Sequence, residues 1–258
     1  MNPFAFDFGY GWPWNYGHVI GIIVFGVLAL LALRLSWPRW VSGLSIALAG
    51  WSFAALVVVQ WVLRMNLPLE LPTERFLAEG SGVVLDAGAG SGRSSLMVLS
   101  ARPESRVLAL DLYEGYFGIP DNGPERLYRN ATTAGVRGRI EAQVGDVREM
   151  SLAAESMDAA VSAYVIDHLS REGVESSLAE IQRVLRPDGE FLLMVIHPDA
   201  WVRFAYPFFA HHGYFGARSD QERWRGHLES AGFTVVEEGV VPGTLFLLAR
   251  KPRSAPAS

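Results

Sequence analysis

The stretch 83-VVLDAGAGSG-92 decides the fold of this chain. It begins with a short, partly β-branched apolar run, which is typical of a buried strand. The run ends at Asp86, and residues 93–101 have the composition of a helix. Between them, glycines occupy alternate positions: Gly88, Gly90 and Gly92. A strand, a tight glycine turn and a helix start form the geometry in which backbone approaches a bound cofactor closely.

The spacing of the glycines distinguishes this turn from that of a nucleotide-dependent oxidoreductase, which would have G-x-G-x-x-G. Here the pattern is D-x-G-x-G-x-G. It resembles motif I of the class I S-adenosylmethionine-dependent methyltransferases. The resemblance implies that S-adenosylmethionine is the cofactor and that it is bound by Asp86, Gly88, Gly90 and Gly92.

A second acid supports the same site. Asp111 ends the predicted strand 106–111 and lies 25 residues beyond Asp86. In a βαβ unit this places its carboxylate beside the glycine turn, where it can accept both hydroxyls of a ribose. The resemblance assigns Asp111 to the ribose of S-adenosylmethionine. It implies further contacts with the adenine and methionine parts by Leu112, Asp146, Val147 and Ala163.

Strands and helices alternate from residue 83 to 250, as a doubly wound α/β sheet requires. Predicted strands cover 139–144, 157–164, 190–196, 233–240 and 244–249, and predicted helices cover 124–135, a segment capped by Ser170, and 219–231. The resemblance implies a Rossmann-like, seven-stranded methyltransferase sheet over residues 83–251 that closes with an antiparallel hairpin. A turn is expected at 186–189, a short helix within the linker 66–82 from Thr73 to Phe76, and disorder at 252–258.

The first 65 residues predict a two-helix transmembrane anchor, with helices at about 14–35 and 41–63. Both runs are nearly free of charge and long enough to span hydrocarbon. The aromatic residues before residue 17 favour a membrane–water interface. Small residues at helical spacing would allow close packing of the two helices: Gly43, Ala47, Gly50 and Ala54. A cleaved signal peptide lacks its basic region here, and buried core helices are the other alternative.

Composition excludes several classes of site and partner. The chain has no cysteine, which rules out disulfides, thiolate metal sites and cysteine nucleophiles. Its formal charge of −5, without a basic stripe, argues against nucleic acid. Because the methyl donor is made in the cytoplasm, we expect the domain there, although Arg34 and Arg39 in the loop between the helices oppose the positive-inside tendency.

Methyl transfer mainly requires alignment and exclusion of water, with a base where the acceptor carries a proton. Candidate catalytic residues follow predicted strands: His197, His168 and Tyr164, of which the first is preferred. Each could instead be structural. Residues 197–218 are rich in aromatic residues and predict a substrate lid. A metal site at Asp199, His211 and His212 is disfavoured, because adjacent histidines point to opposite sides.

The sequence therefore predicts a membrane-anchored S-adenosylmethionine-dependent methyltransferase with a small-molecule or lipid-like substrate. A quinone precursor, an isoprenoid or lipid head group, or a small apolar thiol or hydroxyl compound would suit an aromatic lid beside a bilayer. The alternative is a membrane scaffold or assembly subunit that keeps the fold and the cofactor without turnover.

Overall fold

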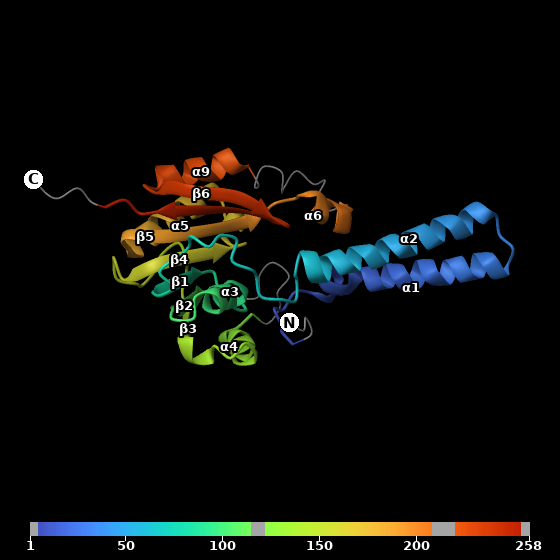
Figure 1. The fold of residues 1–258 in the computed structure, drawn as a ribbon, viewed down its shortest axis with the longest axis horizontal. Coiled ribbons are helices and arrows are strands. Elements are labelled where there is room, and N and C mark those ends of the chain that lie inside the picture. Colours follow the sequence, from blue (N-terminus) through green and yellow to red (C-terminus); the bar gives the residue numbers. More distant parts are fainter. Residues whose placement is uncertain (1–4, 115–121, 208–219, 254–258) are drawn as a thin grey trace, which may run out of the picture.

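The computed structural model describes residues 5–114, 122–207 and 220–253, and its centre is a seven-stranded sheet (Figure 1). The strand order is β3-β2-β1-β4-β5-β7-β6. β1 to β5 pair in parallel, and β7 is antiparallel to both β5 and β6. The strands are β1 (Val83–Ala87), β2 (Arg106–Asp111), β3 (Ile140–Val144), β4 (Met157–Ala163), β5 (Leu185–Ile196), β6 (Thr234–Val241) and β7 (Thr244–Arg250). The predicted doubly wound sheet with an antiparallel close is confirmed.

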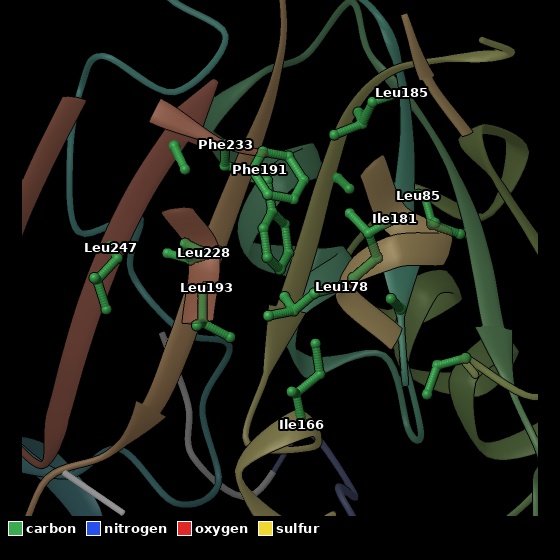
Figure 2. Packing of buried hydrophobic residues seen from close by; sticks show 14 of the residues in the cluster. Leu85, Ile166, Leu178, Ile181, Leu185, Phe191, Leu193, Leu228, Phe233 and Leu247 are labelled. Atoms are coloured by element: carbon green, nitrogen blue, oxygen red, sulfur yellow. The ribbon is translucent and has the colours of Figure 1, made fainter. Parts of the chain in front are cut away.

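Helices cover both faces of the sheet. Side chains alternate between the two faces along each strand, so Leu85 and Val84 of β1 enter different cores. Figure 2 shows the first core, where Leu178 and Leu228 pack near Phe191. The helices of this core are α5 (Arg171–Val184) and α9 (Gln221–Ser230), and those of the second are α3 (Arg93–Ala101) and α4 (Pro124–Thr133). Two short 3-10 helices, η2 (Arg137–Arg139) and η3 (Ile166–His168), precede β3 and α5.

A helical hairpin extends away from the sheet domain (Figure 1). It consists of α1 (Trp12–Arg34) and α2 (Arg39–Val57), and α2 continues as the π-helical turn η1 (Val58–Val62). Both helices are long and apolar enough to cross a membrane, by length and composition. These bounds agree with the predicted ones to within two residues at every end except the last turn, which is π-helical.

The predicted packing face of α2 was wrong. Serines, not the small-residue row, face α1, since Ser42, Ser45 and Ser52 are buried. A Cβ added at Gly43 or Gly50 would meet nothing within 4 Å. The close approach is instead provided by α1, where a Cβ on Gly21 would lie 2.5 Å from the Ser52 hydroxyl oxygen. Serine at these positions is tolerated because Ser42 and Ser45 donate to carbonyl oxygens one turn earlier in α2.

The N-terminal segment (residues 5–10) lies on the sheet domain and not at a membrane interface as the sequence suggested. Phe8 is 1% exposed and packs with Phe6 in the second core, with ring centroids 5.7 Å apart. The backbone N–H of Asp7 donates to the side-chain oxygen of Asn130 in α4 at 3.0 Å. The segment therefore belongs to the domain, although the hairpin separates them in sequence. Trp12, at the start of α1, is half exposed.

Two local predictions were also wrong. Residues 74–79 form turns and no helix, because Leu77 adopts a φ of 47° that a right-handed helix cannot continue. The expected turn at 186–189 lies inside β5 as an irregularity of its pairing with β4. There Asp188 has a φ of 63°, and its N–H donates to the Lys251 carbonyl oxygen at 3.0 Å, which keeps these residues attached to the chain just beyond β7.

Phe8→Ala should destabilise the sheet domain by about 3–5 kcal/mol, because it empties a fully buried ring site. Trp12→Ala is the matched control, since it removes a half-exposed aromatic ring from the same region. Urea unfolding of the full chain in detergent, followed by circular dichroism, measures both. Equal unfolding midpoints for the two variants would show that the N-terminal segment is not part of the domain core.

Candidate functional site

The glycine turn between β1 and α3 is folded against the end of β2. Gly88, Gly90 and Gly92 have φ values of 84°, 49° and 88°, a region that favours glycine. The N–H groups of Gly88 and Ala89 both donate to the Leu110 carbonyl oxygen, at 2.8 and 3.1 Å. A Cβ on Gly88 would also lie 2.5 Å from Val165. The turn can therefore be made only with glycine at its first position.

Asp111 lies beside this turn, as predicted. Its Oδ2 accepts the N–H of Gly90 at 2.9 Å, and its Oδ1 accepts the N–H of Tyr113 at 2.7 Å. Burial raises the pKa of this carboxyl, while the hydrogen bonds from the two N–H groups lower it. The carboxylate is thus fixed at the tip of β2 and retains lone pairs for further donors.

Asn122 was not predicted, yet it borders the same carboxylate. Its Nδ2 donates to Asp111 Oδ1 at 3.3 Å. Its Oδ1 is buried and accepts no hydrogen bond within the described part of the chain. A buried acceptor normally has a donor, so this oxygen fits the hydroxyl of a bound ligand. Its only signal in the sequence is its place in a loop of glycines and prolines.

Asp86 is placed differently from the expectation that its carboxylate holds one end of the cofactor. The side chain is fully buried and accepts hydrogen bonds from the hydroxyls of Ser94 at 2.7 Å and Ser95 at 2.5 Å in the first turn of α3. Burial raises its pKa to about 6. Alternation along β1 explains this, since Asp86 shares the face of Val84, which α3 covers. Asp86 therefore ties the end of β1 to α3.

The remaining predicted cofactor residues differ in exposure. Asp146 is held by Arg148, with Nη2 and Oδ2 2.6 Å apart, and these hydrogen bonds lower the Asp146 pKa. An adenine amino group bound to that carboxylate, as the family resemblance implies, would have to share it with the guanidinium. Val147 is buried in the first core, Leu112 is exposed, and Ala163 is half-buried at the end of β4.

The candidate catalytic residues lie at the carboxyl ends of β4 and β5. Tyr164 follows β4 with a φ of 59°, and its hydroxyl is hydrogen-bonded to Thr244 Oγ1. Burial raises the Tyr164 pKa, and the charge of Arg93 opposes that shift. The phenol is therefore neutral and engaged with β7. His168 is half-buried at the end of η3, a few residues beyond the end of β4.

His197 has a fixed backbone and a side-chain nitrogen without a hydrogen-bond partner among the described residues. Its backbone N–H donates to the Gly243 carbonyl oxygen at 2.9 Å, which fixes the residue at the end of β5. Its Nδ1 is buried and has no hydrogen-bond partner among the described residues. The following Asp199 accepts N–H groups of Gly243 and Val202, both at 2.9 Å, and so anchors the helix that comes next. His211 and His212 lie outside the described residues, and no metal-binding group of three acids or histidines occurs within them.

The described part of the predicted lid, residues 197–207, contains α6 (Ala200–Ala205), which lies between this edge of the sheet and the hairpin (Figure 1). His18 Nε2 of α1 lies 2.9 Å from the Ala205 carbonyl oxygen, and Trp51 of α2 donates to that of Phe204 at 3.3 Å. Trp201 and Phe204 are 46% and 40% exposed. Residues 200–205 of the predicted lid therefore contact the helices of the hairpin, and residues 208–218 lie outside the described ranges.

Comparison with known proteins places this chain in a family. Residues 84–189 match the family model of the methyltransferase domain. A protein of Encephalitozoon cuniculi described as a candidate methyltransferase is 30% identical over 198 residues, which cover 69% of this chain and 84% of that relative. A ubiquinone/menaquinone biosynthesis C-methyltransferase of Syntrophotalea carbinolica is 31% identical over 117 residues, 45% of this chain and 44% of the relative. The chain thus spans less than half of that second relative.

Solved structures show the same fold at lower identity. A candidate S-adenosyl-L-methionine-dependent methyltransferase of Methanococcus maripaludis superposes with a TM-score of 0.56 at 19% identity, over 71% of this chain and 83% of that one. An O-methyltransferase family 2 protein of Planctomyces limnophilus gives 0.53 at 20% identity, over 88% and 61%. These likenesses show the fold of the sheet domain.

Asp86 should make stability depend on pH. Its pKa is about 6 when folded and about 3.8 when unfolded, so the folded state binds more protons between these values and stability falls as pH rises through that window. The cost above pH 6 is about 3 kcal/mol. Asp86→Asn should remove this part of the slope. Urea unfolding from pH 4 to 7.5 measures it, and parallel curves for the variant and the natural chain would contradict the assignment.

Proposed function

The chain belongs to the class I S-adenosylmethionine-dependent methyltransferases, and we propose that it is a membrane-anchored enzyme that methylates a small lipophilic acceptor. The observation that carries the proposal is that α6, which follows the carboxyl end of β5, lies against the domain-facing end of the apolar hairpin. In open α/β sheets ligands bind outside the carboxyl ends of the strands. The acceptor site would therefore adjoin the membrane.

The described residues fit S-adenosylmethionine. Gly90 lies directly beside Asp111 and Asn122, since a Cβ there would be in van der Waals contact with both side chains, at 4.0 and 3.9 Å. The Asp111 carboxylate would accept ribose hydroxyls, and the unpartnered Asn122 oxygen would accept one more donor. When bound, the cofactor supplies a methyl group on a sulfonium sulfur, and that sulfur departs with the rest of the cofactor as the leaving group.

His197 is the group that we assign to proton transfer from an acceptor that carries a proton. It stands at the end of β5, next to the residues that anchor α6, and its buried Nδ1 has no donor or acceptor among the described residues. A side-chain nitrogen in this state can take up a proton once an acceptor is in place. Tyr164 would line the site as a neutral phenol held by Thr244. α6 and its exposed aromatic rings would exclude water.

The exposure of the apolar side chains of the hairpin supports its insertion into a membrane. In the most apolar part of α1 only 11% of the residues are buried, and in that of the span Arg39–Val62, which joins α2 and η1, 28% are. A core helix of a soluble protein would be covered by the rest of the chain, whereas these helices present large apolar side chains along most of their length. A bilayer would cover them, and the supply of methyl donor would then place the domain in the cytoplasm.

The names of two relatives are compatible with a small methyl acceptor, and each relative has a different one. One acts in ubiquinone/menaquinone biosynthesis, and another, from Methylococcus capsulatus, is a malonyl-[acyl-carrier protein] O-methyltransferase that is 30% identical over 58% of this chain and 49% of its own length. A lipophilic compound such as a quinone precursor would reach the carboxyl edge of the sheet from the bilayer, past α6.

Asp111→Asn should weaken S-adenosylmethionine binding at least tenfold, because hydrogen bonds to a charged acceptor contribute about 1.5–3 kcal/mol each. The variant should stay folded, since removing a buried charge relieves a desolvation cost. Isothermal titration calorimetry on the full chain in nanodiscs measures the affinity. Glu141→Gln, an exposed acid on neighbouring β3, is the control, and an equal effect of both changes would refute the assigned role.

With a labelled methyl donor, the full chain in nanodiscs made with lipid extract should transfer label into the organic-solvent phase. His197→Gln should reduce this transfer about 100-fold while leaving donor affinity unchanged. His168→Gln tests the other histidine, and a larger loss there would move the proton-transfer role to it. Label found only in water-soluble products would refute a lipophilic acceptor, and donor binding without any product would favour a scaffold.

A further inference from the structure

Arg93 is the first residue of α3 and directly follows the glycine turn, yet only 8% of it is exposed. The N-terminus of a helix carries a partial positive charge, so a buried cation at this position is unfavourable unless other groups compensate it. The first turn of α3 contains no acidic residue. The compensation must therefore come from another part of the chain.

The compensating groups are backbone carbonyls at the domain-facing end of the hairpin. Arg93 Nη2 donates to the carbonyl oxygens of Leu63 at 3.1 Å and Arg64 at 2.5 Å. Its Nε donates to that of Leu67 at 3.0 Å. Carbonyls at a helix C-terminus lack donors within the helix and carry partial negative charge. Because η1 ends at Val62, the guanidinium caps the second helix of the hairpin.

The same turn is held from its other side by the N-terminal segment. Ser91 Oγ donates to the Phe8 carbonyl oxygen at 2.9 Å, and the buried Asn130 donates to the carbonyl oxygen of Ser91 at 2.9 Å. Arg93 contacts this segment too, through Nη1 and the Tyr10 hydroxyl 3.4 Å apart. Ser91 in the turn and Arg93 directly after it are thus also held by regions that precede the domain in sequence.

Hydrogen bonds to the end of β2 hold one side of the turn, but its own residues restrict the backbone little. Three of its residues are glycines with positive φ, and glycine loses more conformational freedom on ordering than any other residue. A site ordered before its ligand arrives binds more tightly, because the ordering cost has already been met. Whether the turn is ordered in advance therefore depends on its anchors.

We propose that Arg93 is a positioning residue that couples the docking of the hairpin to the shape of the cofactor turn. The hairpin is then part of the machinery that binds the methyl donor, in addition to any contact with lipid. This inference rests on the cofactor site of the family and not on the identity of the acceptor, so a failed acceptor assay leaves it standing.

Arg102 provides a matched control at the opposite end of α3. It is also 8% exposed, and it also donates to backbone carbonyl oxygens, those of Phe76 and Glu74, both at 2.8 Å. Removal of either guanidinium should cost stability through unsatisfied carbonyls. Of these two arginines, only Arg93 joins the glycine turn to the hairpin, so only its removal should change cofactor affinity.

The experiment compares R93M, R93K and R102M in the full chain in nanodiscs. Calorimetric titration with S-adenosylmethionine gives the affinity, and thermal unfolding gives the stability of the same samples. R93M should weaken binding about tenfold, equivalent to 1.4 kcal/mol, at temperatures where it is folded. R93K should fall between R93M and the natural chain, because lysine keeps the charge but lacks the planar fork of donors. R102M should lower the unfolding temperature and leave affinity within about twofold.

Unchanged affinity in a folded R93M would overturn the proposal. Equal weakening in R93M and R102M would do the same, because it would show that general loosening of α3 is sufficient. If R93M gives no folded protein, R93K decides, since it retains a cation at the site: weakened binding with a nearly unchanged unfolding temperature supports the proposal, and natural affinity overturns it.

Discussion

The hydrogen bond from the Gly90 N–H to the Asp111 carboxylate is the contact on which the site depends. It exists because β1 and β2 are parallel neighbours, so the turn that leaves one strand lies beside the acid that ends the other. The bond fixes the turn and aims the carboxylate at the same time. Asn122 completes this corner with an acceptor that has no donor among the described residues. The chemistry of the family thus starts from one constraint of sheet topology.

Much of the fold was predictable because its signals are local. The bounds of α3 and β2 agree with the prediction to the residue, since glycines mark the start of α3 and an acid ends the apolar run of β2. The Ser170 cap of α5 formed as expected, with its oxygen accepting the Gly173 N–H. The antiparallel close came from the family resemblance, because no local pattern specifies which strands pair.

What the sequence did not reveal depends on contacts between distant segments. Phe8 carries no mark that distinguishes a buried ring from an interfacial one, and Ser91, which donates to its carbonyl oxygen, lies 83 residues further along the chain. Arg93 did carry a signal, a cation at a helix start without a nearby acid, which implies a remote partner. Asp86 carried one too, because strand alternation directs it toward α3.

These long-range contacts suggest how a reaction between a water-soluble donor and a lipophilic acceptor could be organised. Under the proposed function, a charged donor would arrive from water and a lipophilic acceptor from the bilayer, so the two binding regions would have to be held in a fixed relation. The base of the hairpin contacts both: Arg93 joins it to the donor turn, and His18 and Trp51 join it to α6. A Cβ on Gly243 would lie 3.0 Å from Leu63, so the turn between β6 and β7 also packs closely there. An anchor attached by a loose linker would leave this relation free, whereas a docked one fixes it.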